Sequence, residues 1–273
     1  SHATCTQADS TGHRIGQVAI SGMATSPTSF HVWQLSLIDT TRIYSALDVG
    51  CGVGDLTHAL RALMPSSALI TALDVQRSSA VATYKRLAVD VMLARMESLP
   101  VASDQYELVT AGHVLPSATN IKTAIIEMYR VLAEGGLLMA SADSKTSGRR
   151  LLEWHAEACR RAGHTMQASR ALGPSLRDQF TLESGHVELA QTFSNVTVHS
   201  RDTELHFPSV EALLDLYEQG LHLRGAPPTT NSEKISTLAL ELRPHMLDIA
   251  TSHANHDGGI RIPRRSGCLI AEK

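Results

Sequence analysis

The sequence of 273 residues lacks any uninterrupted apolar run near the roughly 20 residues that a membrane-spanning helix requires. Hydrophobic residues make up 43% of the chain and charged residues 19%, which are ordinary values for a globular protein. A chain of this length can bury a substantial core without disulfides or metals. We therefore expect a water-soluble protein built on one elaborated domain.

Cysteine is also scarce. The chain has four cysteines, which lie far apart at positions 5, 51, 159 and 268 and form no CxxC pair. This spacing predicts neither a zinc ribbon nor a disulfide framework. A reducing, cytoplasmic location suits such a pattern best.

The sequence has no surplus of positive charge. Its formal net charge is −3, and it contains no long run of lysine and arginine. Proteins that bind phosphate backbones usually carry such a surplus, so nucleic acid is an unfavoured partner. Residues 1–28 have neither a basic start nor an apolar run and are rich in small residues, which is typical of a flexible leader rather than a signal peptide.

Beyond Arg42, short aliphatic runs alternate with amphipathic stretches. This pattern predicts βαβ units, hence an α/β fold with a mostly parallel sheet. The expected strands are residues 43–49, 68–75, 89–94, 106–111 and 137–142, and the clearest helices are residues 77–87 and 119–134, the second ending at Gly135-Gly136.

The alternation breaks after Asp143. Residues 147–190 have a helical pattern that Gly163, Gly173-Pro174 and Gly185 interrupt, and a second helical stretch covers about 208–257. Two further strands are expected, at residues 195–207 and 267–273. We interpret the two helical stretches as cap insertions in a single domain that spans residues 29–273.

The most informative motif follows the first strand, where Asp48-Val49 leads into Gly50-Cys51-Gly52-Val53-Gly54. Glycines at a strand end allow a ligand to approach the backbone closely, and the next helix presents free N–H groups. A dehydrogenase fingerprint reads GxGxxG, whereas here Asp55 occupies the position of its third glycine. The spacing therefore argues against a nicotinamide cofactor.

In these residues the sequence resembles the class I S-adenosylmethionine-dependent methyltransferases, whose first motif is an acid, any residue and then GxGxG. The resemblance covers about residues 43–142. Three further motifs follow in the family's order and spacing: Glu97-Ser98-Leu99-Pro100, Tyr106-Glu107-Leu108-Val109, and Arg130 to Gly136. The resemblance implies a Rossmann-like, seven-stranded, mostly parallel sheet with helices on both faces, S-adenosylmethionine as cofactor, and methyl transfer as the activity.

The resemblance also implies the cofactor-binding residues. Asp48 would hold the ammonium group of the cofactor, directly or through water, and Asp74 would accept both ribose hydroxyls, since a carboxylate can take two such bonds. The full set is Asp48, Gly50, Cys51, Gly52, Asp74, Val75, Arg95, Met96 and Ala111.

Arg95 departs from the family pattern. Many relatives have an acid here that accepts from the adenine amino group, and arginine cannot accept a hydrogen bond. Two interpretations stay open: the guanidinium stacks on adenine while the backbone of Arg95 and Met96 reads its edge, or the side chain points to solvent.

His113 is the candidate general base, because it follows the fourth strand and an imidazole titrates near neutrality. The alternative is a histidine that only shapes the pocket wall. We predict no metal site: the histidines of His253-Ala254-Asn255-His256-Asp257 are poorly spaced for one helix face, and Asp143 has no second acid nearby.

The expected function is methyl transfer to an O, N or C nucleophile of a small molecule, bound between His113 and the helical cap. Two alternatives stay open: an RNA or protein methyltransferase, and a member that binds the cofactor without transferring its methyl group. Phe30 to Leu35 precede the first strand, where the resemblance implies a helix that closes over the cofactor, and Trp33 should pack rather than stack on a ligand.

Overall fold

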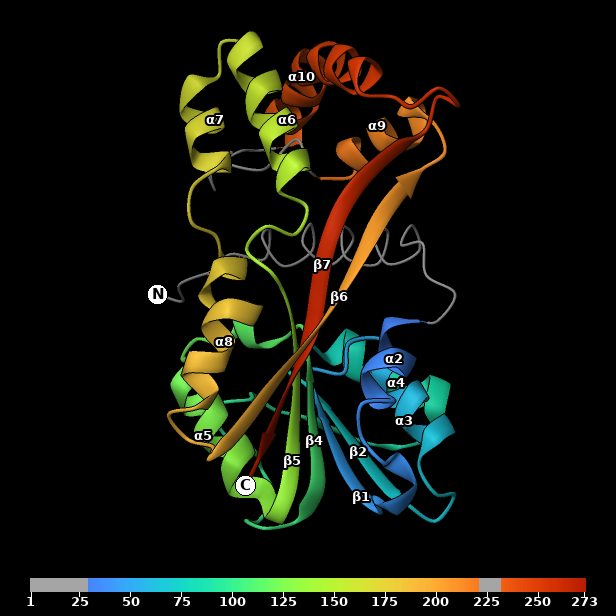
Figure 1. Cartoon of the computed structure of the whole chain (residues 1–273), viewed down its shortest axis with the longest axis vertical. Coiled ribbons are helices and arrows are strands. Elements are labelled where there is room, and N and C mark those ends of the chain that lie inside the picture. The colour runs from blue at the N-terminus through green and yellow to red at the C-terminus, as the bar shows by residue number, and fades with distance from the viewer. Residues whose placement is uncertain (1–28, 221–231) are drawn as a thin grey trace. The chain divides into compact units, whose positions relative to one another are not determined.

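A computed structural model of the chain describes residues 29–220 and 232–273 (Figure 1). The predicted leader at 1–28 lies outside the described residues. The described chain forms two compact units: a sheet unit of residues 29–145, 175–201 and 265–273, and a helical unit of residues 146–174, 202–220 and 232–264. The boundary falls inside two strands, β6 (Asn195–Phe207) and β7 (Ile260–Glu272).

The sheet has seven strands in the order β3-β2-β1-β4-β5-β7-β6. Strands β1 to β5 pair in parallel, and β7 pairs antiparallel with β5. The predicted seven-stranded, mostly parallel sheet with helices on both faces is confirmed. The elements of the sheet unit that precede β6 are α2 (Phe30–Leu35), η1 (Thr40–Arg42), β1 (Ser45–Val49), α3 (Asp55–Leu63), β2 (Leu69–Asp74), α4 (Arg77–Leu87), β3 (Asp90–Leu93), β4 (Tyr106–Gly112), η2 (Leu115–Ser117), α5 (Ile121–Val131), β5 (Leu132–Asp143), η3 (Leu176–Gln179) and α8 (Leu182–Leu189).

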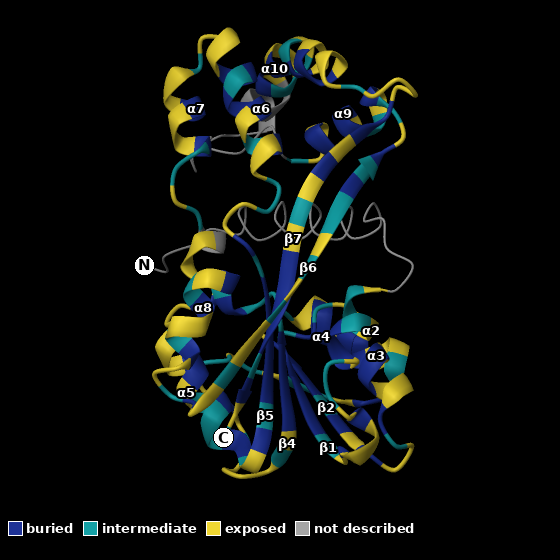
Figure 2. Cartoon of the chain, in the orientation of Figure 1, coloured by how far each residue is buried: buried dark blue, intermediate teal, exposed yellow. Residues whose placement is uncertain are grey.

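Each face of the sheet carries its own apolar core. In Figure 1, α5 and α8 cover one face, and α2, α3 and α4 lie over the other. The α3 helix shows how sequence produces this layer: Leu56, Ala59 and Leu60 recur at helical spacing and are all buried, whereas Arg61 faces outward. The central strands are accordingly buried along most of their length (Figure 2).

The helix expected at residues 119–134 is shorter than the sequence pattern indicates. The α5 helix ends at Val131, because Leu132 already pairs with Tyr106 in the irregular start of β5. Gly135 has a φ of +72° there. The glycine pair therefore shapes the entry to a strand rather than terminating the helix.

Two other expectations need correction. Gly185 does not interrupt a helix but lies inside α8, where an added Cβ would come within 2.7 Å of Phe180 Cζ, so its small size permits close packing. The last strand begins at Ile260 rather than at residue 267. Its first half alternates buried and exposed residues, a strand pattern that Pro263 disguises because proline is rare within sheets.

The helical unit has a core of its own, formed by α6 (Arg149–Arg161), α7 (Thr165–Ala171), α9 (Val210–Glu218), α10 (Ser232–Ser252) and the adjoining halves of β6 and β7. Within this core the hydroxyl of buried Tyr217 forms a 2.8 Å hydrogen bond with His155 Nδ1. The predicted cap insertions overlap this unit, except that residues 175–190 belong to the sheet unit. No helix in the described residues is long and apolar enough to cross a membrane.

Candidate functional site

The predicted cofactor residues meet where the strand order reverses. Strand β1 lies between β2 and β4. Strands β2 and β3 therefore extend the sheet on one side of β1, and β4 and β5 extend it on the other. Open α/β sheets bind ligands outside the carboxyl ends of their strands at such a switch point. The glycine turn follows β1, Asp74 ends β2, and Ala111 and Gly112 end β4, so the fold brings these predicted residues to one edge.

The glycine turn has three residues in the left-handed region, with φ of +72° at Gly50, +58° at Gly52 and +86° at Gly54. A Cβ added to Gly50 would lie 2.3 Å from Val114 Cγ2, so Gly50 lets the turn pack against the segment after β4. A Cβ added to Gly52 would meet nothing within 4 Å. Gly52 is therefore the glycine whose exposed side is open to a ligand.

Neighbouring elements hold the turn in place. The amides of Gly50 and Cys51 both donate to the Leu73 carbonyl, at 2.7 and 2.9 Å. Thr83 of α4 donates its hydroxyl to the Gly52 carbonyl at 2.9 Å. Burial raises the pKa of the Cys51 thiol to about 12, so this cysteine contributes packing and backbone shape rather than a nucleophile.

Asp74 orients its carboxylate with two backbone donors. Oδ2 accepts from the Gly52 amide at 2.9 Å, and Oδ1 accepts from the Gln76 amide at 2.8 Å. A carboxylate offers about four lone-pair positions, so the fixed group can take further hydrogen bonds. The following residue, Val75, has a side chain that is 55% exposed.

Asp48 lies behind the turn and is fully buried. Its oxygens accept from two hydroxyls, Thr57 Oγ1 at 2.5 Å and Thr110 Oγ1 at 2.9 Å. Burial raises the pKa of this carboxyl to about 6, although both hydroxyl bonds act in the opposite direction. The predicted contact between Asp48 and the cofactor's ammonium group stays a prediction, and the structure adds the two threonine partners, which sequence reasoning missed.

Arg95 is tied to its own neighbourhood. Its Nη2 donates to Thr119 Oγ1 at 2.5 Å, and its Nε lies 3.5 Å from Glu97 Oε2. The side chain is nevertheless 58% exposed. Met96 is half-buried and packs against the core beneath α5. The Arg95 guanidinium thus already has two partners within the protein, Thr119 and Glu97. Adenine recognition by Arg95 and Met96 stays a prediction.

His113 has an unusual backbone, with a φ of +54° that residues other than glycine rarely adopt. Its amide donates to the Ser141 carbonyl at 3.1 Å, and its half-buried ring lies 5.4 Å from the Phe30 ring in α2. Such backbone strain is common at functional sites. By contrast, the Ala111 side chain is buried in the core, so any contact with the cofactor would come from its backbone. The role of His113 as a base stays a prediction.

Three side chains that sequence reasoning did not select carry buried polar atoms without hydrogen-bond partners: His31 at Nδ1, Gln34 at both amide atoms and Ser141 at Oγ. The signal available in the sequence was weak, since a glutamine in an apolar helix and a serine in a small-residue strand are both common. Trp33 packs on the core beneath α2 and α3, as expected, and its ring lies 5.8 Å from the Arg201 guanidinium.

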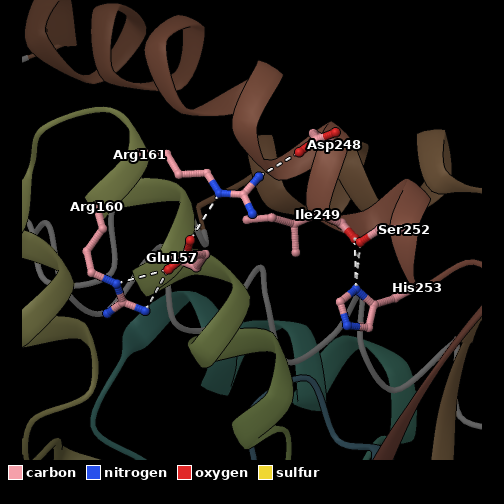
Figure 3. A network of polar contacts seen from close by, with 7 residues as sticks. All are labelled: Glu157, Arg160, Arg161, Asp248, Ile249, Ser252 and His253. Atoms are coloured by element: carbon pink, nitrogen blue, oxygen red, sulfur yellow. Dashed lines mark hydrogen bonds and ion pairs between the residues drawn. The ribbon is translucent and has the colours of Figure 1, made fainter.

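His253 and His256 belong to the helical unit, and Figure 3 shows the polar contacts of His253. His253 Nδ1 lies 2.9 Å from the Ile249 carbonyl and 3.0 Å from Ser252 Oγ, and its ring packs 4.7 Å from the Trp154 ring. Asp143 accepts from the Ser266 hydroxyl at 2.5 Å. Among the described residues, no group of three or more histidine, cysteine or acidic side chains is arranged to hold a metal ion.

Comparisons with known proteins give similarities to methyltransferases. Residues 47–140 match the family described as a methyltransferase domain. The malonyl-[acyl-carrier protein] O-methyltransferase of Enterobacter lignolyticus is 27% identical over 167 residues, which are 59% of this chain and 64% of that protein. The ubiquinone/menaquinone biosynthesis C-methyltransferase UbiE of Hydrogenovibrio crunogenus is 32% identical over 108 residues, 37% of this chain and 42% of that protein.

The chain thus spans roughly two fifths to two thirds of the length of these two relatives. Among solved structures, the YcgJ protein of Bacillus subtilis superposes with a TM-score of 0.56 at 14% identity, over 89% of this chain and 97% of that one. At this identity the likeness shows a shared fold.

Proposed function

We propose that this chain, which carries a class I S-adenosylmethionine-dependent methyltransferase domain, transfers a methyl group to an O, N or C nucleophile of a small molecule. One observation supports the proposal above the others. The Asp74 carboxylate is fixed by the amide of Gly52, the glycine with open space beside it, at the switch point of the sheet. A fixed carboxylate that accepts hydrogen bonds, next to an open backbone turn, suits a ribose and the methionine part of the cofactor attached to it.

The residues present fit S-adenosylmethionine, the cofactor of this domain family. When bound, it supplies an electrophilic methyl group on a sulfonium. Asp74 would accept from the ribose hydroxyls, Gly52 would allow the backbone to approach the cofactor, and Gly50 would hold the turn against Val114. The N-terminus of α3 follows directly, because Gly54 is its N-cap. Its free N–H groups favour a negatively charged group such as a carboxylate.

Methyl transfer is an in-line displacement, so the protein's work is to position the acceptor and to exclude water. His113 follows β4, whose end adjoins the glycine turn through the contact between Val114 and Gly50. From this position His113 would take the proton of a hydroxyl nucleophile as the new bond forms, or would deprotonate an ammonium group before the resulting amine attacks. An acceptor carbon or a neutral amine would need only a shaped pocket wall.

The relatives narrow the acceptor class. Their names describe O-methylation of a malonyl group on acyl-carrier protein and C-methylation in quinone biosynthesis. Both acceptor groups are small organic molecules, in line with the net charge of −3, which disfavours nucleic acid. A malonyl thioester and a demethylated quinone are therefore the first acceptors to assay. A cytoplasmic location stays a prediction from the sequence.

We further propose that the helical unit selects the acceptor, since it departs from the βα alternation that forms the cofactor site. Deleting residues 226–234 should lower turnover more than it lowers cofactor affinity. Residues 226–231 of that segment lie outside the described residues.

The function is tested by calorimetric titration with S-adenosylhomocysteine, followed by a methyl-transfer assay on the acceptor panel. We expect saturable binding and turnover on at least one small acceptor. Binding without turnover on any acceptor, including RNA and protein, would favour the non-methylating alternative. Turnover on RNA or protein alone would contradict the small-molecule proposal.

A further inference from the structure

Four buried polar atoms in the sheet unit lack a hydrogen-bond partner. They are Nδ1 of His31, both amide atoms of Gln34 and Oγ of Ser141. Gln34 and Ser141 are each only 1% exposed. Leaving buried donors and acceptors unpaired is costly, so such groups in a folded protein call for an explanation, and a ligand is one.

The α2 helix directs two of these side chains to one side. His31 and Gln34 are three residues apart, and Phe30 lies four residues before Gln34, so the three share a helix face. On that face the Phe30 ring contacts the His113 ring at 5.4 Å. His31 lies within electrostatic reach of Asp55, the first residue of α3. This face of α2 therefore lies against the end of β4 and the start of α3.

Ser141 reaches the same place from β5. It is paired with Gly112, and a Cβ added to Gly112 would lie 3.9 Å from Ser141 Oγ and 3.2 Å from Leu56 Cδ2 in α3. The Ser141 carbonyl also accepts from the His113 amide. Ser141 and the Phe30 ring of α2 thus both lie against the segment of residues 112–114, whose last residue, Val114, packs on Gly50 of the glycine turn.

The charges around this segment limit what can bind. Asp48 is close in sequence to the turn, is buried behind it and accepts from the Thr57 and Thr110 hydroxyls, so it contributes a negative charge there. Burial lowers the pKa of His31, so its ring is neutral at pH 7. The unpaired set therefore offers neutral donors and neutral acceptors together, which suits a group that carries both signs of charge.

We propose that Gln34, supported by Ser141 and His31, binds the amino-acid end of S-adenosylmethionine. The carboxamide oxygen accepts from the α-ammonium group, and the carboxamide NH₂ and the Ser141 hydroxyl donate to the α-carboxylate. The inference rests on the proposed function, because it assigns residues to the cofactor of that function. It makes Gln34 the direct contact and leaves Asp48 as a negative charge behind the turn.

The test compares two ligands that differ only at this end. S-adenosylhomocysteine carries the amino-acid group, whereas 5′-methylthioadenosine has the same nucleoside and thioether without it. We expect Gln34→Leu to weaken S-adenosylhomocysteine binding about 10- to 100-fold, the worth of hydrogen bonds to charged groups, and to leave methylthioadenosine binding unchanged in calorimetry. The ligand-free Gln34→Leu protein should melt at the same or a higher temperature than the wild type, because an unpaired buried amide is removed.

Gln105→Leu is the matched control, since Gln105 is exposed and its amide donates to the Ser103 carbonyl. Gln34→Met, which keeps the unbranched shape, serves if leucine does not fit. Equal losses for both ligands, or a lower melting temperature without ligand, would show a structural amide and overturn the proposal. Unchanged affinity for both ligands with a raised KM for the acceptor would assign Gln34 to the acceptor instead. If the wild type bound neither ligand, the proposed function itself would fail.

Discussion

The amide of Gly52 donates to Asp74 Oδ2 at 2.9 Å, which joins the glycine turn after β1 to the acid that ends β2. The two residues are 22 positions apart in the sequence. Because the bond uses a backbone N–H, it fixes both the turn and the carboxylate without depending on the side chain at position 52. A ligand that contacts both residues therefore meets groups that are already oriented, which reduces the entropy lost on binding.

Gly50 and Gly52 of the glycine turn should respond differently when a methyl group is added. Gly50→Ala puts a Cβ 2.3 Å from Val114 Cγ2 at a positive φ, so we expect a loss of about 3 kcal/mol or more in the free energy of unfolding. Gly52→Ala meets open space and should cost only about 1–2 kcal/mol from its backbone conformation.

Gly52→Ala should weaken cofactor binding strongly, although it should cost little stability. Its added methyl group would occupy the open side of the turn, so calorimetry should show at least a tenfold loss of S-adenosylhomocysteine affinity in a folded protein. Urea denaturation provides the stability values for both variants. Full affinity in Gly52→Ala would mean that the ligand does not approach this side of the turn.

Asp48 should make stability depend on pH. Its folded-state pKa of about 6 lies above the ordinary value of 3.8, so the folded protein holds the proton more tightly than the unfolded chain. Its contribution is thus fully present below pH 4 and is lost as the pH rises toward 6, by about 3 kcal/mol.

Asp48→Asn keeps hydrogen-bonding capacity toward both threonines and has no proton to lose. The difference in unfolding free energy between variant and wild type should therefore grow in the variant's favour from pH 4 to pH 6.5. Chemical denaturation at several pH values measures this difference. A difference that stays flat across the range would show that Asp48 does not titrate there.

Arg95 should matter little for cofactor binding. Its guanidinium bonds to Thr119 and lies near Glu97, and the side chain is largely exposed, so Arg95→Met should cost at most about 1 kcal/mol of stability. Cofactor affinity should change less than twofold in calorimetry. A loss of tenfold or more would place the guanidinium on the adenine ring.

His113 offers a test of base catalysis. His113→Asn removes the titrating imidazole, and asparagine tolerates the positive φ better than most residues. If His113 is the base, kcat should fall about 100-fold or more and its pH dependence should flatten, while S-adenosylhomocysteine affinity stays constant. A raised KM with an unchanged pH profile would indicate a pocket-wall residue.

The sequence predicted the sheet unit well because its signals are local. The glycine turn, the acid at the end of β2 and the helical stripe of α5 each reflect a few neighbouring residues. The α5 end was misplaced because the pairing of Leu132 with Tyr106 depends on a residue 26 positions away. The start of β7 was misplaced because Pro263 disguised an alternating pattern.

The candidate site was predictable only in its local part. Glycine spacing pointed to Gly50 and Gly52, and the fold brings them to the switch point with Asp74, but the unpaired state of Gln34 and Ser141 depends on what the folded chain places around them. Likewise, nothing in the sequence near Asp48 shows that Thr110, 62 residues later, would donate to it.

The central claim, that Asp74 and the glycine turn bind S-adenosylmethionine, is tested most directly by titrating S-adenosylhomocysteine into the wild type and Asp74→Ala. Asp90→Ala, which changes an exposed acid of β3, is the control. We expect the Asp74 variant to lose about 1.5–3 kcal/mol of binding free energy while the control binds like the wild type. Wild-type affinity in a folded Asp74→Ala protein would contradict the account.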